Sequence, residues 1–169
     1  MSLHLILAAL TAAALLPAQQ LPDVKTERPA PAQPIAYSHK LHAGQLKLEC
    51  VQCHTIPGEG DLATLPPTAK CMACHKTVKP DSPDIVKLAA ADAKHEPIKW
   101  APVYRIPDFV WFNHRKHISV SGVTCESCHG PLKEREVMRR EKDLSMGACM
   151  ECHVAKSAPF NCNTCHEQR

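Results

Sequence analysis

All ten cysteines of this 169-residue chain fall in one repeated pattern, in which two cysteines are separated by two residues and followed directly by a histidine. The cysteine pairs are Cys50 and Cys53, Cys71 and Cys74, Cys125 and Cys128, Cys149 and Cys152, and Cys162 and Cys165. The histidines that follow them are His54, His75, His129, His153 and His166. Thiols of this kind form covalent adducts or bind metals, and an imidazole beside them is a further metal ligand. No cysteine is left over for another purpose.

Cys-x-x-Cys-His is typical of covalent haem attachment. The two thiols lie on one turn of backbone and can form thioethers to the two vinyl groups on one edge of a porphyrin, so that the histidine lies beneath the iron as its proximal ligand. A zinc site, a thioredoxin-like redox pair and a disulfide framework also use paired cysteines, but none requires a histidine directly after the second one. The five copies therefore predict five covalently bound haem c groups.

The remaining histidines are candidates for the second axial position of each iron. His4 lies in a predicted signal peptide, and the other five are His39, His42, His95, His114 and His117. Five candidates for five irons predict that every haem has two histidine ligands and no position for a small-molecule substrate. Such haems are usually low-spin and low in reduction potential.

Two segments that carry these histidines repeat one another. Residues Tyr37–His42 align with Phe112–His117 as an aromatic residue, a capping residue and two histidines three positions apart. In both copies the second histidine precedes the next attachment cysteine by eight positions. Ser38 and Asn113 are favoured N-cap residues, so each copy is expected to begin a short helix whose first turn serves two neighbouring irons. The alternative is that these are ordinary surface histidines.

His95 has weaker support. It follows a predicted helix that has Ser82 as N-cap and Pro83 at its first position. The residues expected to face inward on this helix are Ile85, Val86, Leu88 and Ala89. His95 could instead be a plain helix-terminal residue, in which case Met146 is the substitute ligand and would raise the potential of one haem.

The N-terminus reads as an export signal. An apolar run, Leu5–Leu16, precedes Pro17 and Ala18, and it is shorter than the about 20 residues that cross a bilayer. Cleavage near Ala18 is favoured over a permanent anchor, although no lysine or arginine precedes the run. We therefore expect a signal peptide at 1–18 and a location in the periplasm or on the outer face of the cytoplasmic membrane. A proline-containing tether at 19–33 would then lead into a first module at 34–98 with two haems and a second at 99–169 with three.

The composition leaves little material for a protein core. Aromatic residues make up 4% of the chain, and 15 prolines interrupt its backbone. One haem for roughly 30 residues would supply the missing apolar mass. The expected fold is mainly α with much irregular structure and little or no sheet, with the haems forming the core. The haem-free chain is expected to be largely unfolded.

The formal net charge of +3 does not indicate a nucleic-acid partner. Propionates and iron of five haems would bring the total to about −2 oxidised and about −7 reduced. The basic residues between 133 and 142 are interleaved with acidic ones, a pattern that favours a solvated helix face.

The repeated unit, aromatic-x-His-x-x-His followed by Cys-x-x-Cys-His, resembles the class III cytochromes of the c3 and c7 types. The resemblance implies a class III-like multihaem fold in which the first histidine of each pair ligates the haem of the next motif. His39 would then share an iron with His54, and His114 with His129. By the same resemblance, the second histidine of each pair reaches another haem.

Longer stretches look like the pentahaem subunit of alternative complex III. They are Tyr37–Gly44, Pro66–His75, Ile106–His114 and Cys125–Pro131. That membrane assembly oxidises quinol and passes electrons to a periplasmic acceptor, so the resemblance implies redox protein partners or a quinol-oxidising complex.

The leading hypothesis is therefore an electron carrier with closely packed haems and no catalytic residues. It could be a free shuttle or a subunit of a complex. A multihaem reductase of nitrogen or sulfur oxyanions is the alternative, but it needs an iron with an open position, which the histidine count does not provide. The chain also has no Cys-x-x-Cys-Lys motif. A haem-based sensor would leave most of the haems unexplained.

Overall fold

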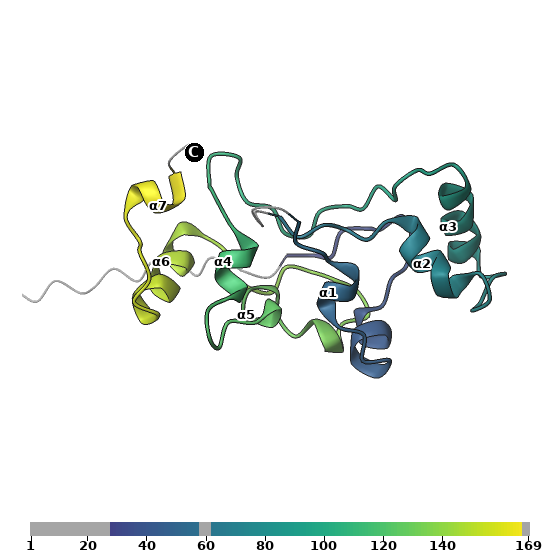
Figure 1. Cartoon of the computed structure of the whole chain (residues 1–169), viewed down its shortest axis with the longest axis horizontal. Coiled ribbons are helices and arrows are strands. Elements are labelled where there is room, and N and C mark those ends of the chain that lie inside the picture. The colour runs from purple at the N-terminus through teal and green to yellow at the C-terminus, as the bar shows by residue number, and fades with distance from the viewer. Residues whose placement is uncertain (1–27, 58–61, 167–169) are drawn as a thin grey trace, which may run out of the picture.

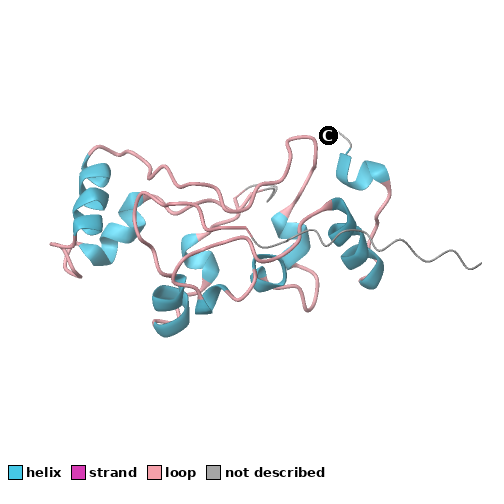
Figure 2. Cartoon of the chain, turned by 180° about the vertical axis from the view of Figure 1, so that it is seen from behind, coloured by secondary structure: helices cyan, strands magenta, loops and turns pink. Residues whose placement is uncertain are grey.

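The structure is a computed structural model that describes residues 28–57 and 62–166. The predicted signal peptide at 1–18, and the tether as far as residue 27, lie outside the described residues. The elements are η1 (Lys40–Gln45), α1 (Cys50–Cys53), α2 (Thr68–His75), α3 (Pro83–Ala93), α4 (His114–Ile118), α5 (Cys125–His129), η2 (Leu132–Glu134), α6 (Met146–Ala155) and α7 (Cys162–His166). Irregular segments join them, and residues 28–57 and 62–166 contain no strand (Figure 2), which confirms the expected fold class. None of the helices in these ranges is long and apolar enough to cross a membrane.

The two cysteines of every attachment motif lie in a helix of their own, and local capping fixes where several of these helices begin. Reciprocal capping boxes join Glu49 to Gln52 at the start of α1 and Thr124 to Ser127 at the start of α5. The Ser145 side chain accepts a hydrogen bond from the backbone N–H of Ala148 at the start of α6. These caps satisfy backbone donors of the first turn, so they hold the two cysteines of a motif on one helical turn.

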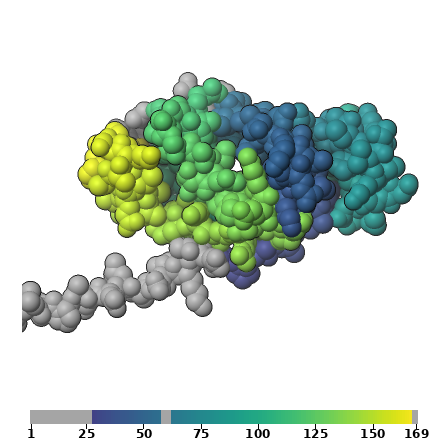
Figure 3. Space-filling view, turned by 90° about the horizontal axis from the view of Figure 1, so that it is seen from below, coloured from purple at the N-terminus to yellow at the C-terminus, as the bar shows by residue number. Residues whose placement is uncertain are grey.

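The helices are distributed along the long axis of the molecule rather than gathered around one centre. Figure 1 shows α3 and α2 at one end, α1 and α5 in the middle, and α6 and α7 at the other end. Figure 3 shows the same order from below, with the teal segment and the yellow segment at opposite ends. The fold therefore spreads its attachment motifs along the molecule.

The two predicted modules meet where η1 packs on η2. The backbone N–H of Lys40 donates to the carbonyl of Arg135 over 2.9 Å. Gly44 is required by this approach, because a Cβ atom at that position would lie 2.3 Å from the carbonyl oxygen of Lys133. The helix that follows His39 is thus held directly against the second half of the chain.

A small apolar core lies at the end of the molecule that carries α2 and α3. Its buried side chains are Ile35, Met72 and Leu88, and Ile85, Ala89, Ile98 and Trp100 pack against them. The sequence correctly predicted the start of α3, with Ser82 at the N-cap and Pro83 at the first position. The expected inward orientation of Val86 is wrong, because its side chain is 54% exposed. Residues 85, 88 and 89 share one face at helical spacing, and residue 86 lies off that face.

Elsewhere the described residues leave large apolar side chains in solvent. Leu62 is 73% exposed, Leu46 60% and Val137 59%. Figure 3 also shows a narrow opening between the blue segment around η1 and α1 and the green segment of the second module. A chain of this size ordinarily buries far more apolar surface. An apolar cofactor bound among the helices would cover the apolar side chains that are now exposed.

The charged stretch between residues 133 and 142 is not the solvated helix that its sequence favoured. Only Leu132–Glu134 are helical, and the residues after them are irregular. The reason is that the charges converge on one carboxylate: Arg135 donates from Nη2 to Glu141 over 2.9 Å, and Arg139 lies 3.3 Å from the same group. The Glu141 side chain is only 10% exposed, so this cluster ties the segment down.

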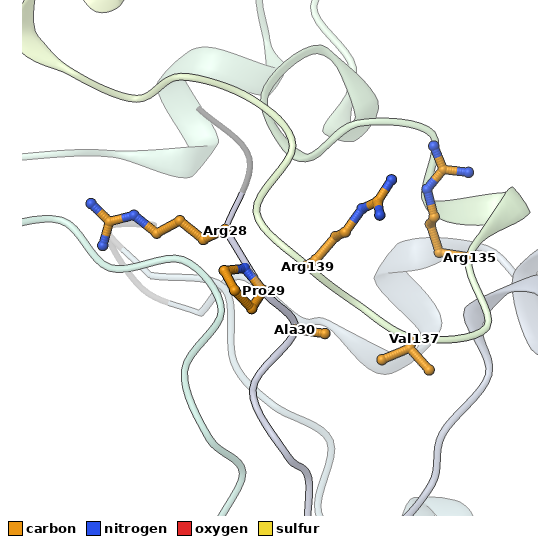
Figure 4. A pocket seen from close by; sticks show the side chains of 6 residues that line it. All are labelled: Arg28, Pro29, Ala30, Arg135, Val137 and Arg139. Carbon is orange, nitrogen blue, oxygen red and sulfur yellow. The ribbon is translucent and has the colours of Figure 1, made fainter. Parts of the chain in front are cut away.

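A hollow of about 500 Å³ lies where the first described residues meet this segment. Its lining residues are Arg28, Pro29, Ala30, Arg135, Val137 and Arg139 (Figure 4). The guanidinium group of Arg28 points away from those of Arg139 and Arg135 in that view. Because Arg135 is already bound by Glu141, the three cations do not form a converging anion site.

Candidate functional site

Four pairs of imidazole rings are distributed along the molecule. Each pair joins one histidine of a His-x-x-His segment to the histidine of an attachment motif. The ring centroids are 6.3 Å apart for His39 and His54, 6.2 Å for His42 and His75, 6.4 Å for His114 and His129, and 5.9 Å for His117 and His153. The rings are nearly parallel in the first and third pairs, at 8° and 5°, and inclined at 53° and 45° in the other two.

This spacing fits an iron held between the two rings. A metal–imidazole bond is about 2.0 Å long and the ligating nitrogen lies about 1.1 Å from its ring centre, so two imidazoles in line on one metal have centres about 6.2 Å apart. The observed separations of 5.9 to 6.4 Å bracket that value. Within residues 28–57 and 62–166, no group of three or more His, Cys, Asp or Glu side chains could hold a metal ion alone. A tetrahedral zinc site needs three or four such ligands, whereas a porphyrin iron needs only the two imidazoles.

Most of these rings, and also the ring of His166 in the fifth motif, are oriented by a hydrogen bond from Nδ1 to a backbone carbonyl. The pairs are His42 with Ser38 at 2.9 Å, His117 with Asn113 at 2.7 Å, His54 with Thr64 at 2.9 Å, His75 with Val78 at 3.0 Å, His153 with Pro159 at 2.5 Å and His166 with Phe109 at 3.2 Å. A carbonyl only accepts, so Nδ1 must carry the proton in each case. Nε2 is thereby left with its lone pair for a metal, as is usual for ligating histidines.

The two His-x-x-His segments have the same aromatic packing. Tyr37 stacks on His42 with centroids 4.5 Å apart and meets His39 edge-on at 4.9 Å. Phe112 stacks on its second histidine at 4.3 Å and meets its first edge-on at 4.7 Å. The aromatic residue at the head of each copy therefore fixes the planes of both imidazoles that follow it.

Asn113 is the N-cap of α4, as predicted, whereas the N-cap of η1 is His39, one residue after the predicted Ser38. The Asn113 side chain accepts from the backbone N–H of Lys116 over 2.9 Å, and α4 starts one residue later. Ser38 accepts from the N–H of Leu41 over 3.0 Å at the head of η1. The first copy differs in being a π-helix, a form that is frequent at functional sites. In both copies the two histidines of the pair turn toward different attachment motifs.

Burial favours the neutral form of two of these imidazoles. Burial, together with the neighbouring His54 and His42, lowers the pKa of His39 to about 4. Burial also lowers the pKa of His129. The neutral ring is the form that ligates a metal. Nδ1 of His39 is buried and has no hydrogen-bond partner in the described part of the chain, and such an atom is rare in a structure that is complete without a cofactor.

The attachment motifs follow one another in a row whose order differs from their order in the chain. Burial is the main cause that raises the pKa of thiols in this row, and a thiol of the neighbouring motif raises it further. The neighbouring thiols are Cys53 and Cys71, Cys50 and Cys125, Cys128 and Cys152, and Cys149 and Cys165. The spatial order is therefore second, first, third, fourth and fifth motif. Figure 1 shows α2, α1 and α5 in this order along the long axis, with α6 and α7 together at the far end.

The fifth motif differs from the other four. Its His166 is exposed, and its nearest aromatic ring is that of Phe109, with centroids 5.9 Å apart. The structure does not bring His95 to it: that residue is exposed and follows α3, at the opposite end of the molecule from α7 (Figure 1, Figure 2). Met146 is the first residue of α6 and is 67% exposed.

Tyr104 is a site residue that the sequence did not indicate. Its hydroxyl donates to the carbonyl of His129 over 3.1 Å and accepts from the backbone N–H of Glu141 over 3.2 Å. Its ring meets the imidazole of His129 edge-on, with centroids 4.7 Å apart. The residue lies outside both repeated segments and all attachment motifs, so no sequence pattern pointed to it.

The comparisons with known proteins agree with this site. Residues 16–100 match the family model described as the class III cytochrome C family, and residues 110–167 match the model described as cytochrome c7 and related cytochrome c. The multiheme cytochrome c subunit of menaquinone reductase from Nitratidesulfovibrio vulgaris (strain Hildenborough) is 39% identical over 123 residues, which are 72% of this chain and 51% of that protein. The chain thus spans about half the length of this curated relative. It belongs to the class III cytochrome c family and is a multihaem electron-transfer protein with covalently bound haem c.

Proposed function

We propose that this chain is an exported pentahaem cytochrome that conducts electrons along a row of haems, as a subunit of a quinone-linked membrane complex. The observation that carries the proposal is the set of four imidazole pairs, each with the separation that an axially ligated iron requires. The fifth attachment motif, at Cys162–His166, extends the row by one more site.

The residues have distinct tasks in this proposal. A bound haem supplies a one-electron couple whose potential depends on its axial ligands and on burial. The two cysteines of each motif fix one edge of the porphyrin, and the imidazole pairs hold the metal from both sides. Hydrogen bonds from Nδ1 to backbone carbonyls hold most of these rings in place, so those ligands need not move when the charge of the site changes.

The row of motifs supports long-range conduction. The first and third motifs, in α1 and α5, are neighbours at the junction of the two modules, and the second and fifth lie at the ends. An electron accepted at either end would pass each intermediate site in turn. No group in this arrangement needs to make or break a bond.

The choice of partner rests on similarity. The relative is by its name a subunit of menaquinone reductase, and the sequence also resembles a subunit of a quinol-oxidising complex. The two differ in the direction of electron flow but share a quinone and a membrane assembly. We therefore propose a quinone-linked complex, and the quinol-oxidising direction stays a prediction. Multihaem c-type cytochromes are typically exported, which agrees with the predicted signal peptide and favours the periplasm.

Intact-mass analysis of the exported protein tests the haem count. We expect the mass of the processed polypeptide plus five haem groups, and a polypeptide that carries zinc or no cofactor would contradict the proposal. Isolation of the tagged chain from its own membranes tests the partner. It should co-purify with a quinone-reactive membrane subunit, and its haems should exchange electrons with a menaquinol analogue only when that subunit is present.

A further inference from the structure

We propose that the haem attached in α7 receives only one axial ligand from this chain and keeps an exchangeable position that binds small ligands such as carbon monoxide. The proposal rests on the proposed function, because it assumes five attached haems. It differs from the prediction of two histidines at every iron, and it adds a ligand-binding site to a protein otherwise built for conduction.

The first observation is the isolation of His166. The eight rings of the four imidazole pairs are all partly buried, whereas this ring is exposed. Its Nδ1 donates to the carbonyl of Phe109 over 3.2 Å, which leaves Nε2 for the iron. The ring beside it is the phenyl group of Phe109, which cannot ligate a metal.

The second observation is the position of His95. Its helix, α3, is held on α2 by the small core, in which Leu88 and Met72 are buried. The backbone at His95 has a φ of 55°, and its N–H donates to the carbonyl of Asp92 over 2.9 Å. To reach α7, at the far end of the molecule, this segment would have to leave the core and cross the whole row (Figure 1).

None of the other four attachment histidines lacks a partner imidazole that His95 could supply. Each of the remaining four already faces a ring of a His-x-x-His segment at 5.9 to 6.4 Å. In the described part of the chain, His95 therefore pairs with no attachment histidine. Although the candidate histidines equal the irons in number, they do not form a fifth imidazole pair.

The third observation concerns how α7 is supported. The backbone N–H of Trp111 donates to the carbonyl of Cys165 over 2.7 Å, and Phe109 holds the Nδ1 side of the proximal imidazole. These contacts with α7 come from one segment. The motif is also the last in the row, so a ligand that reaches it from solvent need not pass another haem.

Carbon monoxide titration of the dithionite-reduced holoprotein tests the proposal directly. We expect one carbon monoxide bound per chain. The double variant Cys162→Ser/Cys165→Ser should carry four haems by mass and bind none. The matched control Cys71→Ser/Cys74→Ser also loses one haem, at the opposite end of the row, and should still bind one.

Two single variants separate the remaining possibilities. His95→Ala should bind one carbon monoxide, as the wild type does, because His95 ligates no iron under this proposal. A wild type that binds none would overturn it. In that event, uptake gained in His95→Ala would identify the histidine as the ligand, and uptake gained in Met146→Leu would identify the thioether. A mass below five haems would instead contradict the proposed function, so the two failures are distinguishable.

Discussion

Replacing Gly44 by alanine should loosen the junction between the two modules. The added Cβ would lie 2.3 Å from the backbone oxygen of Lys133, where ordinary contact begins near 3.4 Å, so the two backbones must separate by about 1 Å. Overpacking of this kind costs about 1–3 kcal/mol, and the better helix propensity of alanine offsets up to about 1 kcal/mol of that. Because the clash is with a backbone atom, the cost lies at the upper end of this range, and we expect Gly44→Ala to lower the free energy of unfolding of the holoprotein by about 2 kcal/mol.

The same shift should disturb haem ligation, because η1 contains His42 and directly follows His39. Denaturant unfolding followed by circular dichroism gives the stability, and low-temperature electron paramagnetic resonance gives the fraction of high-spin iron, which should rise. Gly147→Ala in α6 is the matched control, since its Cβ would meet only the Ser145 hydroxyl at 3.8 Å. That variant should be neutral or slightly more stable. Unchanged stability and an unchanged spectrum in Gly44→Ala would refute the reasoning.

Three further variants test single contacts. His114→Ala removes one ring of the pair with His129, so one additional haem should become high-spin, and an unaltered spectrum would remove His114 from the ligand set. Tyr104→Phe loses two hydrogen bonds and should cost about 1–2 kcal/mol of unfolding free energy in denaturant titrations, whereas no change would show that water replaces the hydroxyl. Hydrogen bonding from Arg135 holds the pKa of Glu141 below its ordinary value of 4.5, so its stabilisation is present above pH 4.5 and lost as the pH falls through the folded-state pKa. The free energy of unfolding should therefore fall less steeply on acidification in Glu141→Gln than in the wild type. An identical pH dependence would exclude this ion pair as a cause of the fall.

Short-range patterns in the sequence predicted much of this fold. The attachment motifs, the start of α3 at Pro83 and the capping role of Asn113 all depend on residues within a few positions of one another. The mainly α class followed from the same local signals. Local chemistry decides these features, since an attachment motif needs only one turn of helix and a cap needs only its own first turn.

Long-range features could not be predicted in this way. The count of histidines took no account of distance, and His95 is kept far from α7 by the packing of α3 on α2. The proximity of Cys50 to Cys125 joins motifs that are distant in sequence, so the order of the row was not visible. The charged segment is irregular after Glu134 because Arg135 and Arg139 both contact Glu141, and the periodicity of charges in the sequence does not reveal such contacts.

The two ends of the row of motifs differ chemically. At one end, the motif of α2 packs beside α3 and the apolar cluster around Leu88. At the other end, α7 is solvent-exposed and is held by contacts with the backbone of one segment. A docking partner could therefore distinguish the two ends by their shape and hydration, independently of any difference in reduction potential. In the proposed quinone-linked complex, the orientation in which the chain docks would then decide which end of the haem row meets the quinone.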